Sequence, residues 1–121
     1  MMTMEENKKQ KGIIVSGYFN PLHKGHLEYF KKSKNLGDTL FVIVNNDNQR
    51  ILKGSEKFML EDERVMIIES LSLIDYTFLS IDQDLTVCKT IKFIFDKFSS
   101  GYSFSFANGG DQTNERIPEY S

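Results

Sequence analysis

The residues best placed for chemistry in this sequence are its two histidines, His23 and His26, which lie three positions apart. A β-branched segment at 12–16 precedes them and a helical pattern begins at Leu27, so they occupy a turn from strand to helix. Residues three apart at a helix start share one face, and both imidazoles can therefore point at one small group. Free N–H groups and the positive end of the helix dipole also favour a phosphate there.

Gly25 lies between the two histidines and keeps a side chain away from the path of that phosphate. The stretch from Gly17 to His26 resembles the HxGH signature of the nucleotidyltransferase superfamily. This superfamily includes glycerol-phosphate and choline-phosphate cytidylyltransferases and small adenylyltransferases, and within it the chain looks most like the glycerol-phosphate enzymes. The resemblance runs from about residue 12 to about residue 111, and its main alternative is two incidental histidines.

The resemblance implies a reaction and a set of residues. CMP passes from CTP to a small phosphomonoester with release of pyrophosphate, and the alternatives are an ATP-dependent adenylyltransferase and a non-catalytic nucleotide-binding module. His23 and His26 would donate to phosphate oxygens, while Lys53 and Arg64 would hold the phosphates. Mg²⁺ would accompany the triphosphate. The turn residues implied to bind the nucleotide are Gly17, Tyr18, Phe19, Asn20 and Gly25.

Asn20 stands where the family usually has aspartate, although asparagine occurs in the adenylyltransferase branches. Two histidines are also zinc ligands in many proteins, but no third ligand lies nearby in the sequence. We therefore expect no metal site built from protein ligands.

The pattern of the chain predicts an α/β fold in which strands alternate with helices. The expected strands are 12–16, 39–44, 76–81 and 102–107, and the expected helices are 27–36, 60–71 and 85–98. The resemblance implies a Rossmann-like parallel sheet with the order 3-2-1-4 and a missing fifth strand. The apolar residues expected to face the core include Leu60, Ile67, Ile68, Leu85 and Cys88.

Two polar segments are expected at the same edge of the sheet as the histidines. Residues 45–57 read as a loop whose cations, Arg50, Lys53 and Lys57, reach a triphosphate, or else as a solvated surface loop. The second segment is a glycine-rich turn beside the ribose and base, or else a plain turn: Asn108, Gly109, Gly110 and Asp111. Arg64 either contacts phosphates, as in the family, or pairs with Glu61 or Glu63.

Length and composition restrict the class of protein. The 121 residues suit one domain at 12–121 after a flexible arm at 1–11. Related enzymes continue with a further strand, so the resemblance leaves three alternatives: a shortened member, a fragment, or a partner chain that completes the site. We expect a homodimer, because an uncovered sheet edge tends to be paired. A net charge of −2 argues against bulk nucleic-acid binding. The single cysteine and the lack of a long apolar run argue against a disulfide, a membrane span and a signal peptide, so we expect a cytoplasmic protein.

Overall fold

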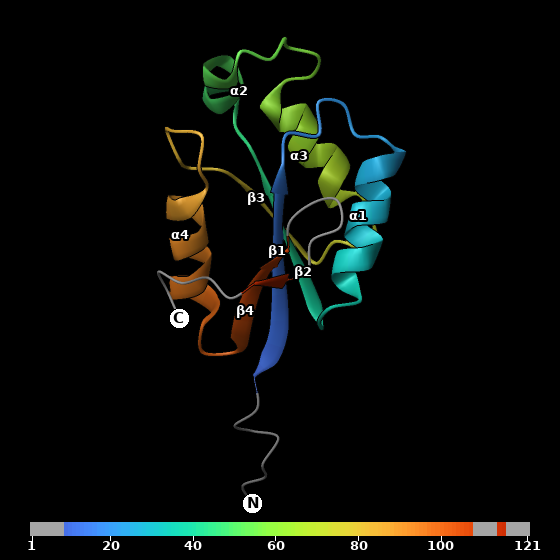
Figure 1. The fold of residues 1–121 in the computed structure, drawn as a ribbon, viewed down its shortest axis with the longest axis vertical. Helices are drawn as coiled ribbons and strands as arrows, with labels where there is room; N and C mark the ends of the chain where they lie inside the picture. The colour runs from blue at the N-terminus through green and yellow to red at the C-terminus, as the bar shows by residue number, and fades with distance from the viewer. Residues whose placement is uncertain (1–8, 108–113, 116–121) are drawn as a thin grey trace, which may run out of the picture.

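The computed structural model describes residues 9–107 and the main chain of 114–115. Strands and helices alternate along most of the chain (Figure 1). The elements are β1 (Gln10–Gly17), α1 (Lys24–Lys34), β2 (Thr39–Val44), α2 (Asp47–Lys53), α3 (Glu61–Glu69), β3 (Tyr76–Leu79), α4 (Cys88–Phe98), β4 (Tyr102–Ala107) and β5 (Asn114–Glu115).

The sheet has the order β3-β2-β1-β4-β5, and the strands β1 to β4 are parallel to one another. This confirms the predicted α/β Rossmann-like fold with the order 3-2-1-4. A two-residue β5 pairs antiparallel with β4, so the position that we expected to be vacant holds a short strand. β1 begins at Gln10, two residues before the expected start of the domain.

Helices cover both faces of the sheet, with α1 and α3 on one face and α4 on the other (Figure 1). Because successive strand residues point to opposite faces, Ile13 and Val15 pack toward α1 and α3, while Ile14 packs toward α4. Every residue of β2 is buried, as expected for a strand covered on both sides.

The segment predicted as a loop at 45–57 contains the helix α2, which is a correction to the sequence prediction. Asn46 caps the start of α2, since its side chain accepts a hydrogen bond from the N–H of Gln49. Gly54 ends the helix with a φ of 85°. The helix therefore depends on its caps rather than on an apolar stripe.

Two of the predicted helix faces need correction. Ile68 of α3 is buried as predicted, whereas the N-cap Leu60 and Ile67 are exposed, because the inward face of the helix is centred on Arg64, Ile68 and the half-buried Val65. The last apolar helix begins at Cys88 rather than near 85, so Leu85 and Cys88 are exposed and Ile91 and Ile94 form the packed stripe.

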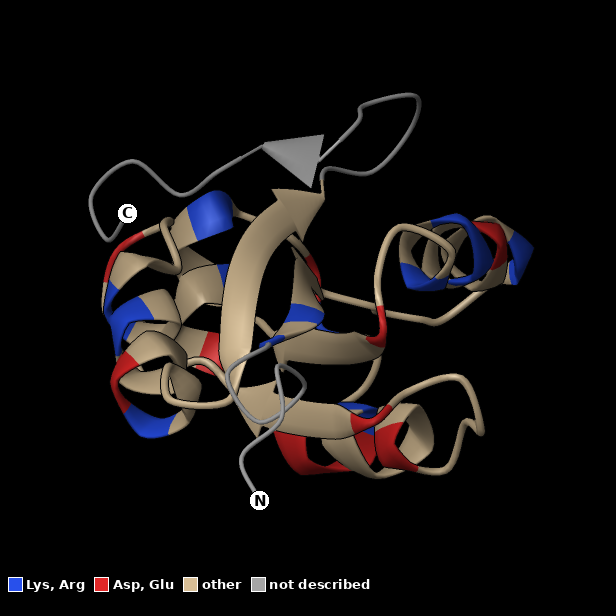
Figure 2. Ribbon diagram, turned by 90° about the horizontal axis from the view of Figure 1, so that it is seen from below, with Lys and Arg blue, Asp and Glu red and all other residues tan. Residues whose placement is uncertain are grey.

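Charged residues lie mainly on the helices that flank the sheet (Figure 2). Acidic residues gather in the first turn of α3 and lysines in the last turn of α1, which is the arrangement that helix dipoles favour. Within residues 9–107 and 114–115, no helix is both long enough and apolar enough to cross a membrane.

Candidate nucleotide site

A cavity of about 820 Å³ opens at the carboxyl end of β1, beside the start of α1. Both histidines and Lys53 line it. The predicted turn residues also line it, and these are Gly17, Tyr18, Phe19, Asn20 and Gly25. The turn predicted at 108–111 lies outside the described residues. Ligand sites at the carboxyl ends of parallel strands are usual for open α/β sheets.

The two histidines form a reciprocal cap at the start of α1. Nδ1 of His23 accepts a hydrogen bond from the N–H of Gly25 at 3.0 Å, and Nδ1 of His26 accepts one from the N–H of His23 at 3.1 Å. The two ring centroids are 3.9 Å apart. Because each Nδ1 is an acceptor, the neutral rings carry their protons on Nε2. The cap therefore fixes the tautomer of two adjacent N–H donors.

This geometry changes the role that the sequence suggested for Gly25. Its amide is used by His23 and is not an open phosphate ligand. A Cβ on Gly25 would lie 2.9 Å from Cε1 of His23, so the glycine leaves room for the imidazole ring. The role of Gly25 in the structure is therefore to hold and accommodate the His23 ring.

The pKa of His26 lies below its ordinary value, mainly because the ring is partly buried and also because His23 is close. Burial disfavours the imidazolium, and a neighbouring imidazolium would disfavour it further. His26 is consequently held in the neutral form, in which Nε2 is a donor and Nδ1 can accept from His23.

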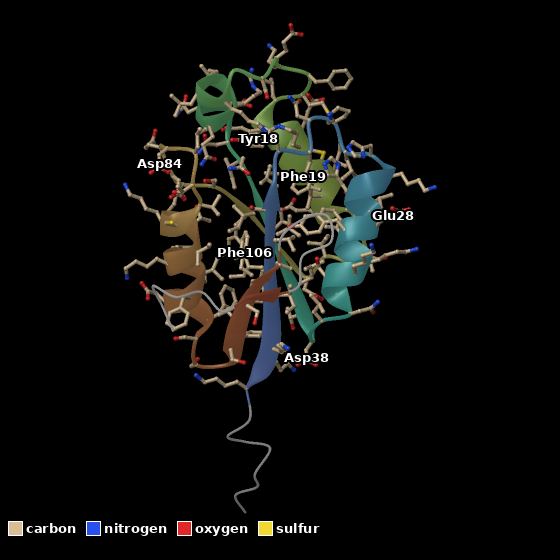
Figure 3. All side chains as sticks on the ribbon, in the orientation of Figure 1. Tyr18, Phe19, Glu28, Asp38, Asp84 and Phe106 are labelled. Atoms are coloured by element: carbon tan, nitrogen blue, oxygen red, sulfur yellow. The ribbon has the colours of Figure 1, made fainter. Side chains whose placement is uncertain are left out.

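Phe19 packs against the ring of His26. It is buried, and its ring meets the His26 ring edge-on with centroids 4.9 Å apart. Its φ of 52° is unusual for a bulky residue. A Cβ on Gly17 would lie 2.7 Å from Cζ of Phe19, so Gly17 leaves the space that this ring fills. Tyr18 and Phe19 lie above β1 at the upper end of the sheet (Figure 3).

Lys53, the last residue of α2, places its ammonium 4.4 Å from the ring centroid of Tyr18. This distance is within the range of a cation–π contact. The pKa of Tyr18 is raised by burial, against a smaller opposing effect of the Arg64 charge, so the phenol is neutral. The sequence prediction that Lys53 reaches the histidine edge of the sheet agrees with this position.

Asn20 binds the main chain of the loop at 54–60 rather than projecting freely into the cavity. Its Nδ2 donates to the carbonyl of Glu56 at 2.9 Å, and its Oδ1 accepts from the N–H groups of Phe58 and Met59 at 3.1 and 2.8 Å. This pattern needs one donor and one acceptor on the same side chain, which asparagine has and an aspartate carboxylate lacks.

Arg64 is fully buried and does not line the cavity. Its guanidinium donates to the carbonyls of Tyr18, Asn45 and Met59 and to the carboxylate of Asp47, over 2.7 to 3.2 Å. The sequence also allowed Glu61 or Glu63 as the ion-pair partner of Arg64. That alternative was wrong, because the acidic partner is Asp47. Direct phosphate contact would require this side chain to leave four acceptors.

Asp47 also organises the segment that carries Lys53. Burial alone would raise its pKa, but hydrogen bonds from Arg64 and from the N–H of Glu61, together with the charges of Arg64 and Arg50, lower it. Arg50, predicted as a flexible cation, donates to the carbonyl of Ser55 at 2.8 Å. Arg50 therefore holds the loop, and Lys57 is exposed.

Tyr29 lines the cavity but was not predicted. Its hydroxyl donates to the carbonyl of Ala107 at 2.7 Å, and burial raises its pKa to about 12. It follows His26 by three positions on α1, and that spacing is the signal that places it on the same helix face. Ser55 and Glu56, also unpredicted, complete the loop side of the cavity.

Among residues 9–107 and 114–115, no three His, Cys, Asp or Glu side chains lie close enough to hold a metal ion. The two histidines use their Nδ1 atoms in the cap, and no third His, Cys, Asp or Glu among the described residues lies close enough to share a metal ion with them. The described part of the site thus offers hydrogen-bond donors and one ammonium, which suit an anionic ligand, and Glu56 adds a carboxylate on the loop side.

Comparison with known proteins identifies the family of this chain. The sequence model of the cytidylyltransferase-like family matches residues 14–115. The bifunctional protein HldE of Helicobacter pylori is 42% identical over 73 residues, which are 59% of this chain and 16% of that protein. The HldE of Citrifermentans bemidjiense is 38% identical over 91 residues, which are 72% of this chain and 18% of that protein.

A solved structure is also similar. The crystal structure of the lipopolysaccharide core biosynthesis protein from Thermoplasma volcanium is 29% identical, with a TM-score of 0.61 over 72% of this chain and 67% of that one. The chain spans under a fifth of the length of each HldE protein. The match of the family model over most of the sequence shows that this chain belongs to the cytidylyltransferase-like family of nucleotidyltransferases.

Proposed function

We propose that the protein transfers a nucleoside monophosphate from a nucleoside triphosphate to a small phosphomonoester and releases pyrophosphate. The observation that carries this proposal is the reciprocal cap of His23 and His26, which presents two Nε2–H donors side by side at the cavity. Two preorganised donors match a phosphoryl group whose oxygens gain charge during transfer.

In this reaction an oxygen of the acceptor phosphate forms a bond to the α-phosphorus, and the bond from that phosphorus to the bridging oxygen of the pyrophosphate breaks. His23 and His26 donate to the oxygens that gain charge. Lys53 contacts the triphosphate and the leaving pyrophosphate. Positioning and electrostatic stabilisation supply the rate enhancement, so no covalent nucleophile is needed.

Mg²⁺ would enter with the triphosphate. Phosphate oxygens and water would hold most of its coordination sphere, as is usual for Mg²⁺ on a nucleotide. Its contribution when bound is to neutralise charge on the phosphates.

CTP is the donor that the family resemblance favours, and ATP is the second candidate because Asn20 replaces the usual aspartate. Sugar phosphates are the first acceptor class to test, since the Thermoplasma volcanium relative is described as a lipopolysaccharide core biosynthesis protein. Phosphorylated alcohols are the second, because of the resemblance to glycerol-phosphate cytidylyltransferase.

Pyrophosphate release tests the proposal directly. The purified protein is incubated with Mg²⁺, with CTP or ATP, and with a panel of sugar phosphates and phosphorylated alcohols. We expect acceptor-dependent pyrophosphate release with one of the two nucleotides. Calorimetric binding of a nucleotide without release under any combination would favour the non-catalytic nucleotide-binding module.

A further inference from the structure

Tyr18 and Lys53 come from different elements and meet at the cavity. Tyr18 follows β1, Lys53 ends α2, and the ammonium lies 4.4 Å from the ring centroid. Both residues line the cavity. A lysine side chain rotates about the bonds of its four-carbon stem, so an exposed ammonium samples many positions unless another group holds it.

The main chain that carries Tyr18 is held by hydrogen bonds. The carbonyl of Tyr18 accepts a hydrogen bond from Nη1 of the buried Arg64 at 2.8 Å, and the adjacent Gly17 carbonyl accepts from the N–H of Asn45 at 2.9 Å. The ring is therefore carried by a main chain that is tied to β2 and α3. A neutral aromatic ring on a held main chain is a suitable partner for a mobile cation.

No ion pair among the described residues competes with Tyr18 for the Lys53 ammonium. Within residues 9–107 and 114–115, the ion pairs join other residues, and none includes Lys53. The contact with the Tyr18 ring therefore favours one position of the Lys53 ammonium over the others that the side chain can reach. That position is at the cavity that both histidines also line.

We propose that Tyr18 is a positioning residue that holds the Lys53 ammonium at the cavity for contact with the phosphates of the nucleotide. This inference rests on the proposed function. Its chemistry is specific to the aromatic face: the hydroxyl of Tyr18 is not needed, and a phenylalanine would serve.

Calorimetry with inorganic pyrophosphate, the product of the proposed reaction, tests the inference in a double-mutant cycle. We expect Tyr18→Leu to weaken pyrophosphate binding about three- to fivefold, as the loss of an exposed cation–π contact does. Tyr18→Phe should bind like the wild type. In a Lys53→Gln background, Tyr18→Leu should have no further effect, because the group that it positions is gone.

Equal weakening by Tyr18→Leu in both backgrounds would overturn the inference, since Tyr18 would then act on the ligand or the fold directly. Equal weakening by Phe and Leu would overturn it too. Thermal unfolding checks that each variant is folded, and Tyr18→Met replaces the Leu variant if that protein does not fold.

A second readout separates this inference from the proposed function. After reductive ¹³C-methylation, the Lys53 resonance, assigned with Lys53→Arg, should be shifted upfield by the Tyr18 ring, retained in Tyr18→Phe and lost in Tyr18→Leu. The absence of this shift in the wild type would overturn the inference. A shift without any nucleotide or pyrophosphate binding would support the placement of Lys53 and refute the proposed function.

Discussion

Nη1 of Arg64 donates to the carbonyl of Tyr18 at 2.8 Å, which joins a buried guanidinium to the turn that carries the histidines. Because the same group also binds Asn45, Met59 and Asp47, we expect Arg64→Ala to lower the free energy of unfolding by about 3 kcal/mol or more. Urea denaturation measures this loss.

Lys92→Ala is the matched control for Arg64→Ala. Lys92 forms an exposed i,i+4 ion pair with Asp96, so its removal should change the free energy of unfolding by about 0.5 kcal/mol or less. If Arg64→Ala kept its stability and only weakened nucleotide binding, the phosphate role implied by the family resemblance would be right and the structural role wrong.

Substitutions of His23 separate its cap from its chemistry. His23→Ala removes both, and should lower turnover about 100-fold and destabilise the protein by about 1 kcal/mol. His23→Asn restores a good N-cap but not the Nε2–H donor, so it should regain stability without regaining turnover. Steady-state kinetics and thermal unfolding of the two variants make the comparison. Full turnover in His23→Asn would show that only the cap matters.

The lowered pKa of His26 makes stability depend on pH. The folded pKa lies below the unfolded value of about 6.5, so the unfolded chain binds more protons between the two values. The native state therefore loses stability as the pH falls below about 6.5 and toward the folded pKa.

From about pH 7.5 to about pH 5.5, we expect a larger loss of unfolding free energy in the wild type than in His26→Gln. Denaturation at both pH values measures the difference, and groups common to both proteins cancel. Identical losses in the two proteins would contradict the assignment of a lowered pKa to His26.

Gly25→Ala should displace the His23 ring, because the new Cβ would lie 2.9 Å from its Cε1. The His23 side chain can rotate away from the new methyl group, so the free energy of unfolding should change by about 1 kcal/mol or less. Turnover should fall at least about tenfold, because the ring is then misplaced. Gly101→Ala is the control, since a Cβ there meets nothing within 4 Å. Normal turnover in Gly25→Ala would show that the position of the His23 ring is not critical.

Asn20→Asp tests the attachment of the loop at 54–60. The carboxylate loses the donor to Glu56 and faces its carbonyl, so we expect a loss of about 1 to 3 kcal/mol and faster proteolysis within the loop. Asn48→Asp, an exposed change of the same charge on α2, should have little effect. Unchanged proteolysis in Asn20→Asp would mean that other contacts hold the loop.

The sheet was predictable because its strands are uninterrupted apolar or alternating segments, as in Thr39–Val44 and Tyr102–Ala107. The helix α2 was not, because Asp47–Lys53 has no apolar stripe. Its stability comes from the caps and from Gln49, whose amide donates to the carbonyls of Asp84 and Thr86, far along the chain.

The histidine pair was predictable from its spacing, but the environment of Arg64 was not. Two of the carbonyls that surround its guanidinium, those of Tyr18 and Asn45, come from segments after β1 and β2 that only the folded sheet brings together. A sequence pattern identifies an arginine in an acidic first turn, and it does not show that this arginine is on the buried side.

The contacts of Asn20 also bear on how this site can change. Asn20 holds Glu56, Phe58 and Met59 through their main-chain atoms, so the anchoring does not depend on which side chains these positions carry. Ser55 and Glu56 nevertheless face the cavity. Substitutions at Ser55 and Glu56 can therefore change the wall of the cavity while the attachment stays intact, and the loop is the natural place to randomise when a new ligand preference is sought.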